Sequence, residues 1–206
     1  MLRIWGRANS INVQKVLWCC NELDLAFERI DAGGKFGVSD TDTYRAINPN
    51  GLVPTIEDDG FVLWESNVIV RYLAARHGDG RLYPADLRVR FDAERWMDWQ
   101  ATTLWPVLRT VFIGLIRTPA ADRDSAAIAS SLESATRSLA IVDRHLGDRS
   151  FVTGDAFTVG DIPLGIAAYR WFSLPIDRPV LSGLSRWYDR LRERRGYQAQ
   201  VMQPLS

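Results

Sequence analysis

Small polar side chains precede the first apolar run of the sequence, in the segment ANSINVQKVLWCCNEL. Ser10 and Asn12 flank the predicted start of a helix, where free N–H groups and the positive end of the helix dipole favour an anion. Ser and Asn are also the preferred N-cap residues of any helix. The pair is therefore a candidate anion site, with ordinary capping as the alternative.

The adjacent cysteines of the same run are poor candidates for chemistry. Cys19 and Cys20 are neighbours and cannot form a C-x-x-C redox pair. The chain has only two histidines and no cluster of cysteines, so it lacks a set of metal ligands and we expect no metal. Both cysteines are interpreted as packing residues of a helix.

Two further segments could together hold the head group of an amino acid or peptide. Pro54, in LVPT, has two interpretations. It is either a proline that limits strand pairing at the start of an edge strand, or a cis residue that turns the main-chain N–H and C=O of Val53 outward. Glu65 and Ser66 open a predicted helix and offer a carboxylate for an ammonium group beside a hydroxyl and an N–H for a carboxylate.

Strands and helices alternate in the first part of the chain, which would position these residues, and the second part is predicted to be helical. Apolar spacings of three and four from Val13 to Leu25 predict a helix, and the turn at Asp58, Asp59 and Gly60 predicts a hairpin. The first part of the chain reads βαβαββα. Helices are predicted at about 85–117, 123–147, 158–173 and 180–194.

Composition excludes several classes of function. Lys plus Arg and Asp plus Glu number 25 each, without a basic block, so we expect no nucleic acid and no membrane surface as partner. No apolar run approaches the ~20 residues that span a bilayer, and MLRIWGR lacks a secretory signal, so we expect a cytoplasmic protein. A nonpolar or mixed small substrate fits this composition.

The order SINVQKV, NPNGLVP, WESNVIVRYLA and FTVGDIPLG resembles the cytosolic glutathione transferase family over essentially the whole chain, and its bacterial theta-like and nu-like groups most closely. The resemblance implies an α/β thioredoxin-like domain that binds glutathione over residues 1–79. It further implies an all-α domain with a hydrophobic substrate pocket over residues 85–206, and a homodimer.

The resemblance also implies roles for single residues. Val53 would pair with the cysteinyl backbone of glutathione, Pro54 would be cis, and Glu65 with Ser66 would hold the γ-glutamyl end. Where relatives commonly carry Lys, Arg or Gln to contact the glycyl carboxylate, this chain has Leu52. Lys35 could reach that carboxylate instead, or remain a solvated loop residue.

An aromatic stretch, ERWMDWQATTLWPVLRTVFIGLI, has the spacing of a core stripe. Its residues Trp105, Arg109, Phe112 and Ile116 share one face of the predicted helix, and the resemblance implies that this stretch forms the wall of the electrophile pocket. Arg109 could recognise a negative group on a substrate or form a salt bridge. Farther on, the segment TVGD that ends at Asp161 is interpreted as a structural capping box.

The resemblance leaves three functions open. The first is a glutathione transferase, in which Ser10 and Asn12 stabilise the thiolate of glutathione for attack on a small hydrophobic electrophile. The second, of the nu-like type, directs the same thiolate at sulfur or peroxide, as a glutathione-dependent disulfide reductase or peroxidase. The third is a binding module without catalysis, which would have no need of the intact VP and ES elements.

Overall fold

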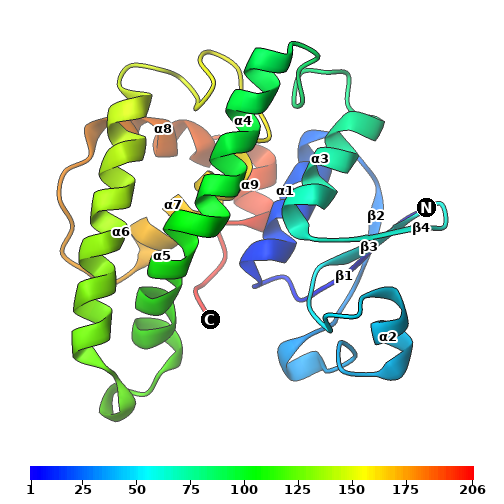
Figure 1. Ribbon diagram of the computed structural model, residues 1–206, viewed down its shortest axis with the longest axis horizontal. Coiled ribbons are helices and arrows are strands. Elements are labelled where there is room, and N and C mark those ends of the chain that lie inside the picture. The colour runs from blue at the N-terminus through cyan, green and yellow to red at the C-terminus, as the bar shows by residue number, and fades with distance from the viewer.

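A small sheet with its helices lies beside a larger group of helices in the computed structural model, which describes residues 1–206 (Figure 1). The elements of the first half are β1 (Leu2–Trp5), α1 (Ile11–Glu22), β2 (Phe27–Ile30), η1 (Gly34–Phe36), α2 (Asp42–Ile47), β3 (Thr55–Asp58), β4 (Phe61–Trp64) and α3 (Ser66–His77). This order confirms the βαβαββα prediction.

The sheet is mixed, with the strand order β2-β1-β3-β4. β1 runs parallel to β2 and antiparallel to β3, and β3 and β4 form the predicted hairpin. The hairpin turn has positive φ angles of 50° at Asp59 and 87° at Gly60, as a two-residue type I′ turn requires. Along β1, Leu2 and Ile4 are buried while Arg3 is exposed, so one face of the strand is in the core.

The second half is entirely helical. Its elements are α4 (Leu87–Trp99), η2 (Gln100–Leu104), α5 (Trp105–Phe112), η3 (Ile113–Arg117), η4 (Ala120–Asp122), α6 (Ser125–Leu146), α7 (Asp161–Ser173), α8 (Ser182–Arg192) and α9 (Arg195–Gln200). The predicted helix 85–117 is thus interrupted by one π-helical turn, η2, and ends in a second, η3. Pro106 lacks the N–H that would bond to the carbonyl of residue 102, which explains the irregular turn before α5. The short helix α9 lies beyond the last helix predicted from the sequence, which ended at residue 194.

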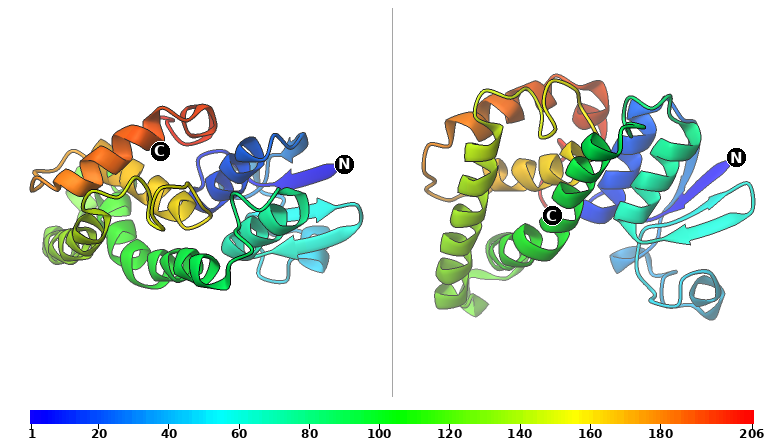
Figure 2. Two further views of the ribbon diagram at one scale, coloured as in Figure 1. Left: turned by 90° about the horizontal axis from the view of Figure 1, so that it is seen from above. Right: turned by 45° about the horizontal axis from the view of Figure 1, so that its top comes forward.

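One hydrophobic core continues through both halves, and α1 lies at its centre. This helix packs against α3 of its own half and against α7 and α9 of the other (Figure 2). The ring of Trp18 contacts those of Phe157 and Tyr197, with centroids 5.3 and 4.7 Å apart. Cys19 and Cys20 are fully buried, and burial raises the pKa of both thiols, that of Cys20 to about 12. Both cysteines are packing residues, as expected.

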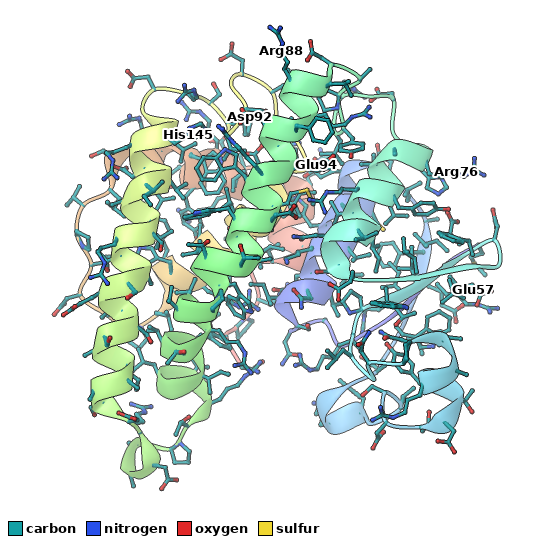
Figure 3. All side chains as sticks on the ribbon, in the orientation of Figure 1. Glu57, Arg76, Arg88, Asp92, Glu94 and His145 are labelled. Carbon is teal, nitrogen blue, oxygen red and sulfur yellow. The ribbon has the colours of Figure 1, made fainter.

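Polar contacts also join the halves. Arg194 forms an ion pair with Glu22 at the C-terminal end of α1, and Arg71 of α3 pairs with Glu94 and Asp98 of α4. Figure 3 shows Glu94 on the side of α4 that faces α3. None of the helices is long and apolar enough to cross a membrane.

The TVGD segment forms half of a capping box and a larger buried network. The Asp161 carboxylate accepts hydrogen bonds from the main-chain N–H of Thr158 at 2.9 Å and of Val152 at 3.0 Å, and from Nε1 of Trp187 at 2.9 Å. The Thr158 hydroxyl does not cap α7 in return. Burial raises the pKa of Asp161 to about 6. The network joins α7, α8 and the loop that follows α6.

Candidate active site

The start of α1 carries side chains that have no partner in the protein. Ser10 occupies the N-cap position with φ −80° and ψ 127°, but its hydroxyl does not cap the helix. Its main chain is fixed at both sides, since Ser10 N donates to Arg7 O at 3.1 Å and Gln14 N donates to Ser10 O at 2.9 Å. A rigid backbone therefore holds a free hydroxyl at the positive end of a twelve-residue helix.

A cavity of about 260 Å³ opens beside this hydroxyl, between the two halves of the chain. It is lined by Arg7, Asn9, Ser10, Ile11, Asn12, Leu52, Val53, Trp105, Arg109, Phe112, Ile113, Arg117 and Arg170. The structure thus brings the candidate thiolate donors together with three of the four predicted pocket residues.

Ile116 is the predicted pocket residue that does not line this cavity. Ile113 and Arg117 line it instead, because residues 113–117 form the π-helical turn η3. A π turn contains one more residue than the α-helical spacing assumes, so the residue that faces the cavity moves from position 116 to position 117.

The segment before β3 offers free main-chain groups to a ligand. The Val53–Pro54 peptide bond is cis. Neither the N–H nor the C=O of Val53 takes part in a main-chain hydrogen bond, so both are available to an extended peptide. The preceding carbonyl, that of Leu52, is fixed by the Tyr44 hydroxyl at 2.7 Å and by Nδ2 of Asn48 at 2.8 Å.

Gly51 completes this loop because no other residue fits there. Its φ is +62°, and a Cβ at this position would lie 2.9 Å from the carbonyl oxygen of Ser39. The NPNG sequence is thus a structural requirement for the direction in which Val53 leaves the turn.

A second, smaller cavity of about 60 Å³ lies at the start of α3. It is lined by Asn12, Asn48, Asn50, Leu52, Val53, Pro54, Trp64, Glu65 and Ser66. Glu65 is exposed and has a positive φ of 75°, a conformation that a non-glycine residue adopts at some energetic cost and that often marks a functional position. Asn12 lines both cavities and so connects the two candidate sites.

A buried lysine lies beneath Ser66. Lys15 of α1 is only 3% exposed, and its Nζ donates to the Ser66 hydroxyl oxygen at 3.5 Å. Burial lowers the pKa of Lys15 to about 7, and the nearby Glu65 opposes this shift. Because Ser66 accepts from the lysine, its own hydroxyl proton is free to donate toward the cavity.

Lys35 and Leu52, the two residues considered for the glycyl carboxylate, line different cavities. Lys35 lines a third cavity of about 480 Å³ together with Arg7, Arg29, Asp31 and Ser206, among others, and its Nζ lies 5.1 Å from the Phe36 ring centroid. Leu52 is 68% exposed and lines the two cavities that contain Asn12. No group of three or more His, Cys, Asp or Glu residues is placed to hold a metal ion.

Comparison with known proteins agrees with this geometry. Residues 9–76 match the family model for the glutathione S-transferase N-terminal domain, and residues 125–190 match that for the C-terminal domain. The chain is 43% identical to glutathione S-transferase GstB of Escherichia coli, over the full length of both. The chain belongs to the glutathione S-transferase family.

Solved structures show that the whole fold of this glutathione S-transferase matches that of other family members. The theta class glutathione S-transferase of Xanthomonas axonopodis pv. citri, with glutathione bound, has a TM-score of 0.96 and 49% identity, covering 100% of this chain and 99% of that one. Its apo form has a TM-score of 0.88. The thioredoxin-like domain followed by a helical domain is thus the expected transferase fold.

Six residues that line the cavity beside Ser10 were not predicted from the sequence, namely Arg7, Asn9, Ile11, Ile113, Arg117 and Arg170. Three of them are arginines. Arg7 follows β1, Arg117 ends η3 and Arg170 lies within α7, so only the folded chain brings them together. A signal was present for Arg170, which is the one charged residue in the apolar run from Ile162 to Leu174. A charge in such a run is rarely left buried without a reason.

Proposed function

We propose that this glutathione S-transferase conjugates glutathione to electrophiles, with Ser10 as the main hydrogen-bond donor to the thiolate and Asn12 as the second. The proposal rests on one observation above all. The Ser10 hydroxyl is held at the start of α1, lines the cavity between the two halves and has no partner in the protein.

The energetics of this assignment are sufficient. A free thiol has a pKa of ~8.5, and lowering it by about two units requires ~2.7 kcal/mol of preference for the anion. One hydrogen bond to an anion contributes ~1.5–3 kcal/mol, and the helix N-terminus adds up to ~1 kcal/mol. Neither side chain has to accept a proton, since each donates to sulfur and the thiol proton leaves to solvent.

Glutathione would lie across the smaller cavity in an extended conformation. The main chain of Val53 would pair with its cysteinyl unit next to the cis Pro54, while Glu65 receives the α-ammonium of the γ-glutamyl end. Ser66 would donate to the γ-glutamyl carboxylate through its hydroxyl and main-chain N–H, with Lys15 Nζ beneath the hydroxyl oxygen.

The rest of the site belongs to the second substrate. In this proposal residues 1–79 bind glutathione and residues 85–206 supply the electrophile pocket through Trp105, Arg109 and Phe112. The glycyl carboxylate would extend past the exposed Leu52 toward the cavity of Lys35. The family resemblance further leads us to propose a homodimer in the cytoplasm.

Titration of the ultraviolet thiolate absorbance of bound glutathione tests the assignment. Ser10→Ala should raise the pKa of the bound thiol by about one to two units, the equivalent of one lost hydrogen bond to an anion. Asn12→Ala should raise it less. The Cys19→Ala/Cys20→Ala variant is the control and should leave it unchanged. If neither Ser10→Ala nor Asn12→Ala moves this pKa, the assignment is wrong.

A panel of electrophiles separates the proposed reaction from its alternative. An aryl halide reports conjugation, whereas a mixed disulfide of glutathione reports disulfide reduction. We expect turnover of the aryl halide and its loss in Ser10→Ala. Turnover of the mixed disulfide alone would favour the reductase.

A further inference from the structure

The cavity beside Ser10 is lined by several positive charges. Four arginines line it, namely Arg7, Arg109, Arg117 and Arg170, and no carboxylate side chain does. None of the four forms an ion pair with Asp or Glu, although many other arginines of the chain are paired in this way. The chain has no formal net charge, so this concentration of positive charge is local.

Arg170 shows that the charge is built into the fold. Its side chain is 3% exposed, and it donates to Oε1 of Gln14 at 3.0 Å and to the carbonyl of Asn9 at 3.4 Å, but its Nε has no partner. Burial, together with the nearby positive charge of Arg117, lowers the pKa of Arg170 to about 10. A buried guanidinium with only neutral partners is destabilising until an anion pairs with it.

The other three arginines differ in how many of their donors already form hydrogen bonds within the protein. Arg109 makes no hydrogen bond or ion pair in the structure, so its five donors are available. Arg117 is engaged, since its Nε and Nη2 donate to the main-chain oxygen of Ser206 at 3.1 and 2.6 Å. Arg7 donates to Oδ1 of Asn9 at 3.2 Å. Arg109 and Arg170 therefore have the most capacity for a new anion.

Aromatic rings complete the binding surface. The guanidinium of Arg170 lies 5.3 Å from the ring centroid of Phe112 and 5.8 Å from that of Trp105, and these two rings lie 6.4 Å apart. The cavity of about 260 Å³ can hold a molecule of the size of a substituted benzene. An uncharged apolar ligand would displace water from the cations and leave them unpaired, which opposes its binding.

We propose that the second substrate of this enzyme is a small electrophile that carries a carboxylate, which Arg109 and Arg170 bind while the reactive carbon faces the glutathione sulfur at Ser10. This inference rests on the proposed function. The reaction is a substitution: the thiolate forms a carbon–sulfur bond, and the leaving halide takes the electron pair of the broken carbon–halogen bond. No oxidant or reductant takes part.

A matched pair of electrophiles tests the carboxylate directly. 4-Chloro-3-nitrobenzoate and 4-chloro-3-nitrobenzamide have nearly the same shape and undergo the same substitution, but only the first is an anion. kcat/KM is measured for each at saturating glutathione and divided by the rate without enzyme. We expect the wild type to prefer the benzoate by about tenfold or more, which corresponds to one charge-assisted hydrogen bond.

Variants locate the preference. Arg109→Gln should reduce the preference to within about twofold, since it removes the charge and most of the donors of the freest arginine. Arg88→Gln is the matched control, because Arg88 lies at the start of α4 and points away from the molecule (Figure 3). It should retain the full preference. Arg170→Gln tests the buried partner, and Arg109→Gln remains decisive if that variant does not fold.

Each other outcome overturns the inference in a recognisable way. A wild type without a preference, or an Arg109→Gln variant that keeps it, would contradict the carboxylate site while conjugation itself stands. A higher KM for glutathione in Arg109→Gln, with the preference unchanged, would assign the arginines to a carboxylate of glutathione. If the wild type binds glutathione but accelerates neither compound, the proposed conjugation fails as well.

Discussion

Removal of the Asp161 side chain should destabilise the protein more than a capping contact would. The carboxylate accepts from three buried donors, Thr158 N, Val152 N and Trp187 Nε1. Each buried donor left without an acceptor costs about 1–3 kcal/mol, so three cost about 6 kcal/mol. At pH 7 the substitution also removes a buried charge, which returns about 3 kcal/mol for a pKa raised to about 6. Asp161→Ala should therefore lower the free energy of unfolding by about 3 kcal/mol.

Urea unfolding followed by tryptophan fluorescence measures this loss at fixed protein concentration. Asp155→Ala is the matched control, since Asp155 lies in the loop before α7 and is exposed, and it should change the free energy of unfolding by less than about 0.5 kcal/mol. A loss below about 1 kcal/mol for Asp161→Ala would refute the reasoning, because it would reduce the network to a helix cap.

The pH dependence tests the sign of the pKa shift. A carboxyl group whose pKa is raised in the folded state binds a proton there between about pH 4 and pH 6 that the unfolded chain does not bind. Its contribution to stability is therefore complete at low pH and is lost as the pH rises through 6. The effect of Asp161→Ala should be larger at pH 5 than at pH 7. The opposite order would mean that the hydrogen bonds outweigh burial and lower this pKa.

Three further predictions concern the glutathione site. Glu65→Gln should weaken glutathione binding about tenfold or more in calorimetry, since it leaves the α-ammonium of the ligand without its counter-charge, and an unchanged affinity would contradict the γ-glutamyl assignment. Leu52→Lys should tighten binding by up to ~1.5–3 kcal/mol, and no gain would indicate that Lys35 or another cation already binds the glycyl carboxylate. Between pH 7 and 10 the unfolded chain binds a proton that the folded Lys15 has lost, so the free energy of unfolding of the wild type should gain up to about 1.4 kcal/mol per pH unit from this residue. Lys15→Met should remove this gain. If the variant and the wild type show equal slopes, Lys15 titrates normally.

The order of strands and helices in the first half was predictable because its signals are local. The alternation in β1, the Asp59–Gly60 turn and the apolar spacing of α1 each lie within a few residues. Seven residues that line the two cavities could be named because family motifs mark their positions: Ser10, Asn12, Leu52, Val53, Pro54, Glu65 and Ser66. Ile11, Asn48, Asn50 and Trp64 line the same cavities and were not predicted. The thiolate titration and the Glu65→Gln variant test whether Ser10, Asn12 and Glu65 have the roles that the motifs imply.

Other features depend on contacts between distant parts of the chain. Gln14 and Lys15 have the polar character of a solvated helix face, yet both are 3% exposed because the two halves of the chain cover α1 from both sides. Arg7 and Arg170 meet at one cavity although 163 positions separate them, which no local pattern encodes. The shift from Ile116 to Arg117 follows from a π turn that a constant helical period cannot anticipate.

The central place of α1 has a consequence for any attempt to divide the chain. A fragment that ends after α3 would expose Trp18 and the other side chains that now face α7 and α9, and it would present a large apolar surface to water. We expect such a fragment to aggregate and the helical half alone to lose the helix on which it is built. A hybrid that joins halves from two relatives would fold only if the helical half carries residues that fit the α1 of the other half, as Phe157 and Tyr197 fit Trp18 here. The two halves therefore have to be exchanged together.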